Sequence, residues 1–376
     1  MVVVQVSGAL FFAACIAYLL LAFVGALRFR EGKLVPVRTP PVTVMLPCHG
    51  VSARLYDCLR SVCDHDYRGP VQVVFGLHAA DDPARAVIDK VIADLPGLDA
   101  QVVVDDRRVG SHPKSCNLAN MMVAVRHDVL ILVDADVIVP KGFLPTIVAA
   151  LDGDNVGAAT CMYKGTPEPG FASRLGTAYI NDWFIPSAMV DLAIHGLGTT
   201  YGAAAAVPRH VLESIGGFEA MASAVSSDFA LGHEVRRAGW KIALAPLVVA
   251  TVVDERSLLD LYRHELRWMR AIRSCRPLDH ALWICSSGLV PLVLLAQAWP
   301  PLVAVGAPCG YIALRLLLHF FLRRRIRLNP PEPHILPVRE VANFVLWAGS
   351  LLSRRVRWGA RVLVTGRGNT MRVDGG

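Results

Sequence analysis

The sequence predicts an α/β domain held between apolar membrane segments, and three observations lead to this expectation. Strand-like and helix-like segments alternate with short connections from Val42 to Val133, which is the pattern of a parallel α/β sheet. Hydrophobic residues make up 54% of the 376 residues, and the mean hydropathy of +0.44 is too apolar for an ordinary soluble domain. The apolar excess lies at the two ends of the chain, so we expect membrane helices on both sides of the sheet domain.

Residues 1–30 are predicted to form an N-terminal transmembrane anchor. The run from Val2 to Leu27 is long enough to span a bilayer, and no Lys or Arg precedes it, so it lacks the basic start of a signal peptide. Arg28, Arg30 and Lys33 follow directly. The positive-inside rule then places the next domain in the cytoplasm.

Residues 40–256 are predicted to form the α/β domain. Its first half is expected to contain strands at Val42–Leu46, Val71–Leu77, Gln101–Val104 and Val129–Val133, and helices at Ala53–Asp64, Pro83–Leu95 and Ser115–Arg126. Its second half is expected to contain helices at Phe143–Leu151, Phe171–Ala193 and Ser226–Ala238, and strands at Val156–Tyr163, Trp240–Ala245 and Leu247–Val253. The small residues of Gly196–Ala206 are interpreted as a flexible segment where backbone approaches a ligand closely.

The C-terminal third is predicted to return to the membrane. Residues 257–276 are expected to form a basic amphipathic helix at the interface, and residues 281–322 two transmembrane helices with a turn at Pro300-Pro301. Arg315 is expected to extend its side chain to the bilayer surface.

The last 42 residues give a less definite pattern. Residues 335–352 are interpreted as a re-entrant or interfacial segment, or as a third C-terminal span, because Arg354, Arg355 and Arg357 follow them. Residues 353–376 are interpreted as a basic tail.

Charge and cysteine content exclude several classes of function. The net charge of +7 comes from basic residues beside the apolar runs, which favours anionic lipid headgroups over nucleic acid as partners. The sequence contains no zinc-finger or RNA-binding signature. Its nine cysteines include no Cys-x-x-Cys pair, so they suggest buried residues in a reducing compartment rather than a disulfide or zinc framework.

Two groups of carboxylates could bind a nucleotide and a metal. Asp134-Ala135-Asp136 follows a buried strand, and alternate residues point to one face, so both carboxylates could reach one Mg²⁺ or Mn²⁺ shared with substrate phosphates. The alternative is a solvated turn. Asp81 and Asp82 follow the second predicted strand, where a carboxylate could bind uracil or ribose. The alternative is that Asp82 caps a helix with Pro83 at its first position.

Two further features could serve catalysis. Asp228 at the start of a helix could act as a general base, or could simply cap the helix. His264, Arg267 and Trp268 occupy one face of the basic helix and could bind a diphosphate leaving group. The alternative for this helix is binding to anionic headgroups, with Trp268 at the interface.

The order of these motifs resembles the D, DxD, D, (Q/R)xxRW pattern of membrane glycosyltransferases. Val109-Gly110-Ser111-His112-Pro113-Lys114 with Asn117-Leu118 resembles the VGxNPKxxNL block of the ceramide glucosyltransferase family, glycosyltransferase family 21. Gly216-Gly217-Phe218-Glu219, Asp228-Phe229, Arg263–Trp268 and Arg276-Pro277-Leu278 are similar to its bacterial hopanoid-biosynthesis branch. Two positions depart from the family pattern, His264 for Gln or Arg and His112 for Asn.

The resemblance implies a GT-A domain, which is a Rossmann-like nucleotide-diphospho-sugar transferase fold. It also implies a protein of the bacterial inner membrane whose catalytic domain lies in the cytoplasm. It implies inverting transfer of glucose or N-acetylglucosamine from a UDP-sugar to a hydroxyl of a ceramide-like or hopanoid lipid, with Mg²⁺ or Mn²⁺. Carried over by position, the residues that it implies are Asp81 or Asp82 and Lys114 for the donor, Asp134 and Asp136 for the metal, Asp228 for the base, and His264, Arg267 and Trp268 for the diphosphate and acceptor. The alternatives are a processive polysaccharide synthase and a catalytically inactive membrane scaffold.

Overall fold

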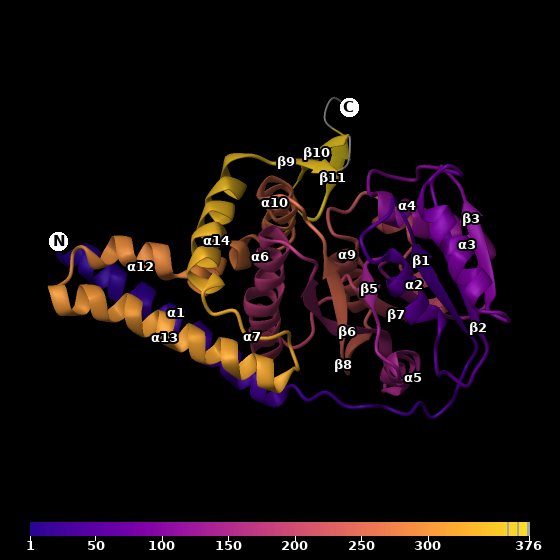
Figure 1. Ribbon diagram of the computed structural model, residues 1–376, viewed down its shortest axis with the longest axis horizontal. Coiled ribbons are helices and arrows are strands. Elements are labelled where there is room, and N and C mark those ends of the chain that lie inside the picture. Colours follow the sequence, from indigo (N-terminus) through magenta and orange to yellow (C-terminus); the bar gives the residue numbers. More distant parts are fainter. Residues whose placement is uncertain (359–360, 367, 374–376) are drawn as a thin grey trace. The chain divides into compact units, whose positions relative to one another are not determined.

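The computed structural model describes residues 1–358, 361–366 and 368–373, and the chain divides into two compact units (Figure 1). The first unit consists of Met1–Arg30, Pro169–Gly196 and Glu255–Ala360, and the second of Glu31–Glu168, Leu197–Asp254 and Arg361–Gly376.

The second unit is built on a mixed sheet. Among the described residues the strands of this sheet are ordered β3-β2-β1-β4-β7-β6-β8-β5. Their bounds are β1 Val42–Pro47, β2 Val71–Leu77, β3 Asp99–Val104, β4 Val129–Val133, β5 Val137–Ile138, β6 Val156–Pro167, β7 Ala204–Pro208 and β8 Lys241–Val253. The half from β3 to β4 is parallel, as predicted, whereas β7 runs antiparallel to both β4 and β6 and β5 runs antiparallel to β8. The parallel arrangement expected for the strands from Val42 to Val133 is therefore confirmed, and beyond them the sheet is mixed, with β6 and β8 parallel to each other.

Helices cover both faces of this sheet. One apolar core packs the sheet against α2 Leu55–Cys63, α3 Ala84–Asp94 and α5 Phe143–Ala149. A second core packs its other face against α4 Pro113–Met121, α8 Arg209–Ser214 and α9 Ser227–Arg237. The side chains of β1 alternate accordingly, with Val44 and Leu46 in the first core and Met45 in the second.

Two predictions for this unit are wrong in detail. Residues 204–206 of the expected flexible segment form part of β7, because alanine side chains are small enough for a strand inserted between β4 and β6. The two strands expected on either side of Pro246 form the single strand β8. Its pairing with β6 shifts between Cys161 and Met162, and this irregularity accommodates a proline that cannot donate to the ladder.

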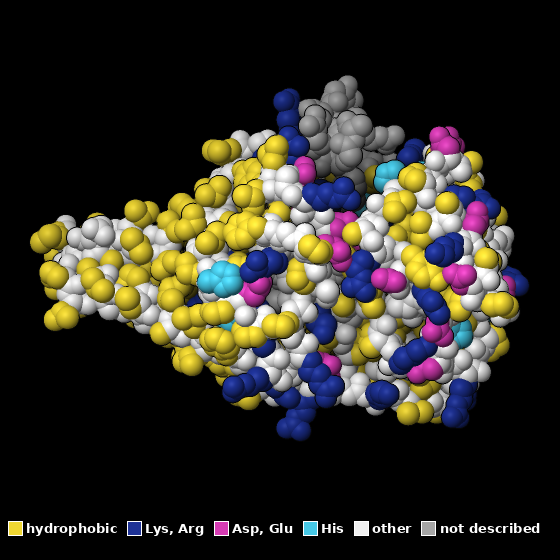
Figure 2. Space-filling model, in the orientation of Figure 1, with side chains coloured by type: hydrophobic (Ala, Val, Ile, Leu, Met, Phe, Trp, Pro, Cys, Tyr) yellow, Lys and Arg dark blue, Asp and Glu magenta, His cyan; other side chains and the backbone are white. Residues whose placement is uncertain are grey.

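The first unit is helical. Its elements are α1 Val2–Arg28, α6 Phe171–Tyr179, a π-helical turn Ile180–Phe184, α7 Ile185–His195, α10 Leu258–Cys275, α11 Pro277–Leu282, a 3₁₀ turn Trp283–Ser287, α12 Leu289–Ala296, α13 Pro301–Arg325, α14 Ile335–Leu352 and the strand β9 Arg355–Trp358. Helices α1, α12 and α13 pack against one another. On the face drawn in Figure 2, the side chains coloured by type over the left-hand part of these three helices are nearly all hydrophobic, which is the surface that a bilayer core would accept.

Within the described chain, α1, α13 and α14 are long and apolar enough to cross a membrane. The pair Pro277–Ser287 and Leu289–Ala296 also qualifies when taken together, but it bends by 69° at Gly288. The segment predicted at 281–322 thus contains one broken apolar helix and one continuous helix that begins at the expected prolines.

Arg315 contradicts the expectation that it reaches the bilayer surface. Its side chain is 1% exposed, and its Nε lies 3.3 Å from Oε1 of Glu340 on α14. The Tyr311 hydroxyl donates to the same carboxylate oxygen at 2.8 Å, and Arg315 Nη1 donates to the carbonyl of Asp182 at 3.0 Å. The guanidinium therefore faces the interior of the helical unit, where charges persist only when they are paired.

Candidate active site

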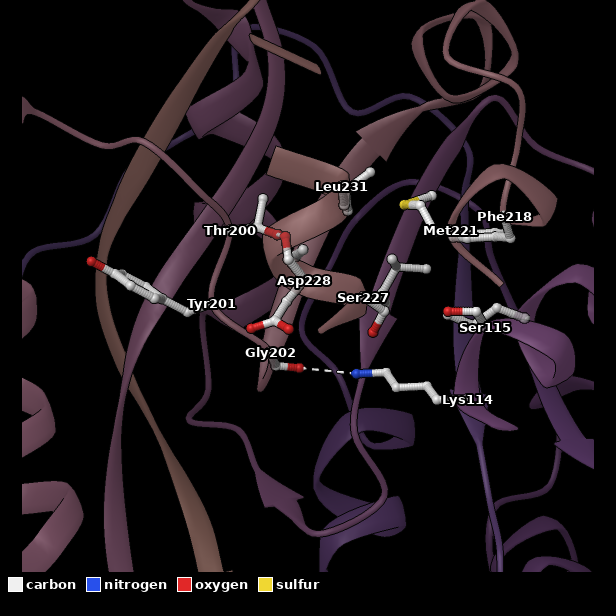
Figure 3. Close-up of a pocket in the computed structure, with 13 residues that line it drawn as sticks. Lys114, Ser115, Thr200, Tyr201, Gly202, Phe218, Met221, Ser227, Asp228 and Leu231 are labelled. Carbon is white, nitrogen blue, oxygen red and sulfur yellow. Dashed lines mark hydrogen bonds between the residues drawn. The ribbon is translucent and has the colours of Figure 1, made fainter. Parts of the chain in front are cut away.

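Lys114 and Asp134 form an ion pair at the carboxyl end of β4. Lys114 lies in the first turn of α4, and its ammonium contacts Oδ1 of Asp134. The same ammonium donates to the carbonyl of Gly202 at 3.2 Å, as Figure 3 shows. Asp134 directly follows β4, and its backbone N–H donates to the carbonyl of Ala203 at 3.1 Å. The lysine thereby joins the strand end to the segment that precedes β7.

The charges of Lys114 and Asp134 also influence the pKa of Asp136. Burial, followed by the negative charge of Asp134, raises the pKa of Asp136 to about 7, although Lys114 acts in the opposite direction. Burial works against a charged Lys114, yet the carboxylate of Asp134 raises the pKa of this lysine above its ordinary value. One ammonium thus balances the two neighbouring carboxylates only in part.

Asp228 lies in the first turn of α9, and Ser226 is the N-cap of that helix. The hydroxyl of Ser226 donates to Asp228 Oδ1 at 2.6 Å, and the hydroxyl of Thr200 donates to the Asp228 carbonyl at 2.8 Å. A Cβ placed on Gly202 would lie 3.3 Å from Asp228 Oδ2. Figure 3 shows the carboxylate of Asp228 and the ammonium of Lys114 both near Gly202.

Lys114 and Asp228 line one pocket. Its polar lining also includes Ser115, Thr200 and Ser227, and an apolar floor comes from Leu118, Leu132, Phe218, Met221 and Leu231. Ser115, Thr200 and Gly202 are not among the site residues predicted from the sequence. The signal for the last two was the run of small residues at 196–206, of which Gly202 does lie close to the charged side chains of Lys114 and Asp228.

The carboxylate of Asp82 is occupied by hydrogen bonds within the protein. It is 8% exposed and accepts hydrogen bonds from the backbone N–H groups of Gly50 and Ala84, each at 2.9 Å, and pairs with His49 Nδ1 at 2.8 Å. Burial acts to raise the pKa of Asp82, but these partners hold it below its ordinary value. Asp81 is exposed, so of the two residues it is the more accessible to a nucleotide.

His264, Arg267 and Trp268 belong to α10 in the first unit, whereas the four residues Lys114, Asp134, Asp136 and Asp228 belong to the second. The rings of His264 and Trp268 lie 4.3 Å apart between centroids, as expected for one helix face. His264 Nδ1 also contacts the carboxylate of Glu255. Burial would raise the pKa of Glu255, but His264 and, to a smaller extent, Arg267 keep it below its ordinary value.

The donor set at Asp134 and Asp136 fits a divalent cation that is shared with a substrate. Among the described residues no group of three or more His, Cys, Asp or Glu side chains gathers to hold a metal. Two hard carboxylate groups are nevertheless what Mg²⁺ or Mn²⁺ commonly takes from a protein when phosphate oxygens and water complete its coordination. The raised pKa of Asp136, caused by burial and then by the charge of Asp134, agrees with such an ion, because a bound cation would favour the ionised form of both carboxylates.

Comparisons with known proteins relate this arrangement to sugar transfer. A ceramide glucosyltransferase of Gibberella zeae is 31% identical over 177 residues, which cover 42% of this chain and 34% of that protein. An N-acetylglucosaminyltransferase of Azorhizobium caulinodans is 25% identical over 258 residues, covering 64% of this chain and 62% of that protein. The chain therefore spans about a third of the first relative and less than two thirds of the second.

A solved structure shows the same fold. The mannosyltransferase from Pyrobaculum calidifontis, in complex with GDP-Man and Mn²⁺, superposes with a TM-score of 0.57 at 19% identity, covering 91% of this chain and 98% of that one. The chain thus has the GT-A fold that the family resemblance implied. The family profile described as Glycosyl transferase family 21 matches residues 9–374, nearly the whole length, and the chain belongs to that family.

Proposed function

We propose that this protein is a membrane-bound inverting glycosyltransferase that moves a hexose from a UDP-sugar to a hydroxyl of a membrane lipid. The observation that carries the proposal is that Lys114, which pairs with Asp134, lies beside Gly202 together with Asp228 at one pocket of a GT-A domain. A base and a positively charged group placed a short distance apart are what a displacement at a sugar carbon requires. The names of the relatives support a lipid acceptor and either glucose or N-acetylglucosamine as the sugar.

In this mechanism Asp228 is the general base. Ser226 donates to Oδ1 and leaves Oδ2 directed toward Gly202, so Oδ2 is the atom that would accept the proton of the lipid hydroxyl. The hydroxyl oxygen forms a bond to the anomeric carbon as the bond from that carbon to the diphosphate oxygen breaks. Attack opposite the leaving group inverts the configuration at the anomeric carbon.

The leaving diphosphate carries the developing negative charge. We assign Lys114 to it as a fixed positive charge, and Asp134 and Asp136 to a Mg²⁺ or Mn²⁺ ion, which would supply Lewis-acid stabilisation when bound. Asp81, the more exposed of the two candidates, is assigned to the nucleotide. Arg267, His264 and Trp268 of α10 are assigned to the diphosphate and the acceptor, a role that the family pattern supports.

The membrane arrangement follows from charge and length. We propose that α1 and α13 cross the inner membrane of a bacterium, because both helices end in basic residues, Arg28 with Arg30 just beyond it in the first and Arg323–Arg325 in the second. Both basic clusters then lie in the cytoplasm with the sheet unit. The basic helix α10 would lie on anionic headgroups, where a lipid acceptor can enter from the bilayer.

The proposal is tested with the purified protein in nanodiscs containing either ceramide or a polyhydroxylated hopanoid. UDP-glucose and UDP-N-acetylglucosamine are supplied separately with Mg²⁺ or Mn²⁺, and lipid products are identified by mass spectrometry. We expect one monoglycosylated lipid, of inverted configuration, that is lost when both cations are omitted. A long polymer would favour the polysaccharide synthase, and no product with any pairing would contradict the proposed substrates.

A further inference from the structure

The C-terminal end of the second unit forms a hairpin that the sequence did not predict. Strands β10, Arg361–Thr365, and β11, Met371–Val373, pair antiparallel. Asn369 lies in the turn between them with φ of 63°, a left-handed conformation that asparagine tolerates better than most residues.

This turn contacts the segment that leads into α9. Asn369 accepts the backbone N–H of Ser226 at its Oδ1, at 2.9 Å, and donates from Nδ2 to the Ser226 carbonyl at 3.0 Å. Its own carbonyl accepts the N–H of Val225 at 3.1 Å, and Met371 N donates to the carbonyl of Ser223 at 2.9 Å. One asparagine side chain therefore holds both backbone groups of the residue that caps α9.

Ser226 in turn holds Asp228. Its hydroxyl accepts the N–H of Phe229 at 3.4 Å, which starts the helix, and donates to Asp228 Oδ1 at 2.6 Å. The hairpin is also tied to the loop before α4, because the hydroxyl of Ser111 donates to the Met371 carbonyl at 2.9 Å. The same hairpin thus contacts the segments that carry Asp228 and Lys114.

We infer that Asn369 is a positioning residue for Asp228, and that the C-terminal hairpin is part of the catalytic centre rather than a tail. This inference rests on the proposed function of Asp228 as base. Without Asn369 the backbone of Ser226 can rotate, its hydroxyl no longer fixes Oδ1, and Oδ2 is no longer held toward the pocket. A base displaced by a fraction of an ångström loses reaction rate much more than it loses affinity for the donor.

A matched control separates positioning from general stability. Asn155 has φ of 60°, donates from Nδ2 to the carbonyl of Gly239 at 2.8 Å, and accepts the N–H of Lys241 at its backbone carbonyl at 2.8 Å. It therefore resembles Asn369 in backbone conformation and in donating a side-chain hydrogen bond to a backbone carbonyl, but it lies directly before β6 and does not line the pocket. Glycine at either position keeps the left-handed backbone and removes only the side chain.

The test compares kcat and KM for the UDP-sugar in Asn369→Gly and Asn155→Gly, each as the full chain in nanodiscs. We expect Asn369→Gly to lose about 10- to 100-fold in kcat with little change in KM, and Asn155→Gly to behave as wild type. Ser226→Gly should reproduce the loss, since glycine remains an acceptable N-cap but lacks the hydroxyl. Wild-type kcat in either Asn369→Gly or Ser226→Gly would overturn the inference.

Hydrogen exchange keeps the inference testable if no lipid product forms with the wild-type protein. The amides of residues 225–230 should exchange faster in Asn369→Gly than in Asn155→Gly, as read by mass spectrometry of the peptide that covers them. If the wild type forms no lipid product but Asn369→Gly still shows this faster exchange, the proposed function is contradicted and the positioning role is not. Unchanged exchange in Asn369→Gly would overturn the positioning role itself.

Discussion

Arg339 of α14 and Glu265 of α10 form a buried two-point ion pair. Arg339 Nη1 donates to Oε1 and Nη2 to Oε2 of Glu265, each at 2.8 Å, and the arginine side chain has no exposed surface. The guanidinium also lies over the ring of Tyr179, 5.1 Å from its centroid, and Tyr179 stacks on Trp268 at 5.8 Å. Arg339 thus holds Glu265 and Tyr179 in place, and through Tyr179 it supports Trp268 on the helix face that bears the candidate diphosphate residues.

Replacing one partner of this pair should destabilise the first unit severely. Arg339→Met leaves the Glu265 carboxylate buried without its partner, at an expected cost of about 3–5 kcal/mol. The thermal unfolding midpoint of the purified protein should therefore fall. The double variant Arg339→Met with Glu265→Leu should recover most of the loss, because it removes both charges.

The control for this prediction is an exposed pair on the same helix. Arg263 lies 3.8 Å from Asp260 with more than half of each side chain exposed, so Arg263→Met should cost less than about 1 kcal/mol. Equal midpoints for Arg339→Met and Arg263→Met would contradict the assignment of a supporting role to the buried pair.

Asp82 should make the stability of the second unit depend on pH in acid. Its pKa in the folded chain is lowered, so its ionised form favours the fold above the ordinary value of about 4, and this contribution is lost as the pH falls through the lowered value. The free energy of unfolding of Asp82→Asn, measured with a denaturant, should therefore decrease less than that of the wild type as the pH falls. Asp81→Asn changes the exposed neighbouring residue, so its free energy of unfolding should depend on pH as that of the wild type does. The same pH dependence in Asp82→Asn as in the wild type would contradict the prediction.

Gly202 should be intolerant of a side chain because it lies between Lys114 and Asp228. The Cβ of Gly202→Ala would lie 3.3 Å from Asp228 Oδ2, so the carboxylate must move, and we expect about a 10- to 100-fold lower kcat. Gly32→Ala is the control, since its Cβ would have no neighbour within 4 Å. The rate of product formation is compared at saturating donor. Equal rates in the two variants would show that activity does not depend on the observed position of the Asp228 carboxylate.

The sequence predicted the features that depend on local pattern. The strands from Val42 to Val133 were placed correctly because each is a short apolar run bounded by turn residues. The resemblance to glycosyltransferase family 21 was confirmed, because it rests on motifs that remain recognisable in a single sequence. The roles of Asp134, Asp136 and Asp228 remain predictions, although the structure places Asp228 beside the pocket lined by Lys114, which forms an ion pair with Asp134.

The features that were missed depend on tertiary partners. The strand at Ala204–Pro208 has no alternation to reveal it, since its small side chains are buried on both faces. Arg315 was assigned to the bilayer surface because its partner Glu340 is 25 positions away in the chain and on a different helix. Asn369 gave no signal, because its contact with Ser226 joins residues 143 positions apart.

The most direct test of the account is Asp228→Asn, measured for sugar transfer and for UDP-sugar binding in the same nanodiscs. The substitution keeps the size of the side chain and removes its capacity to accept a proton, so we expect kcat to fall by about 10²- to 10⁴-fold while donor affinity stays within a few fold. Wild-type turnover by Asp228→Asn would contradict the assignment of Asp228 as the base, and with it the proposed mechanism.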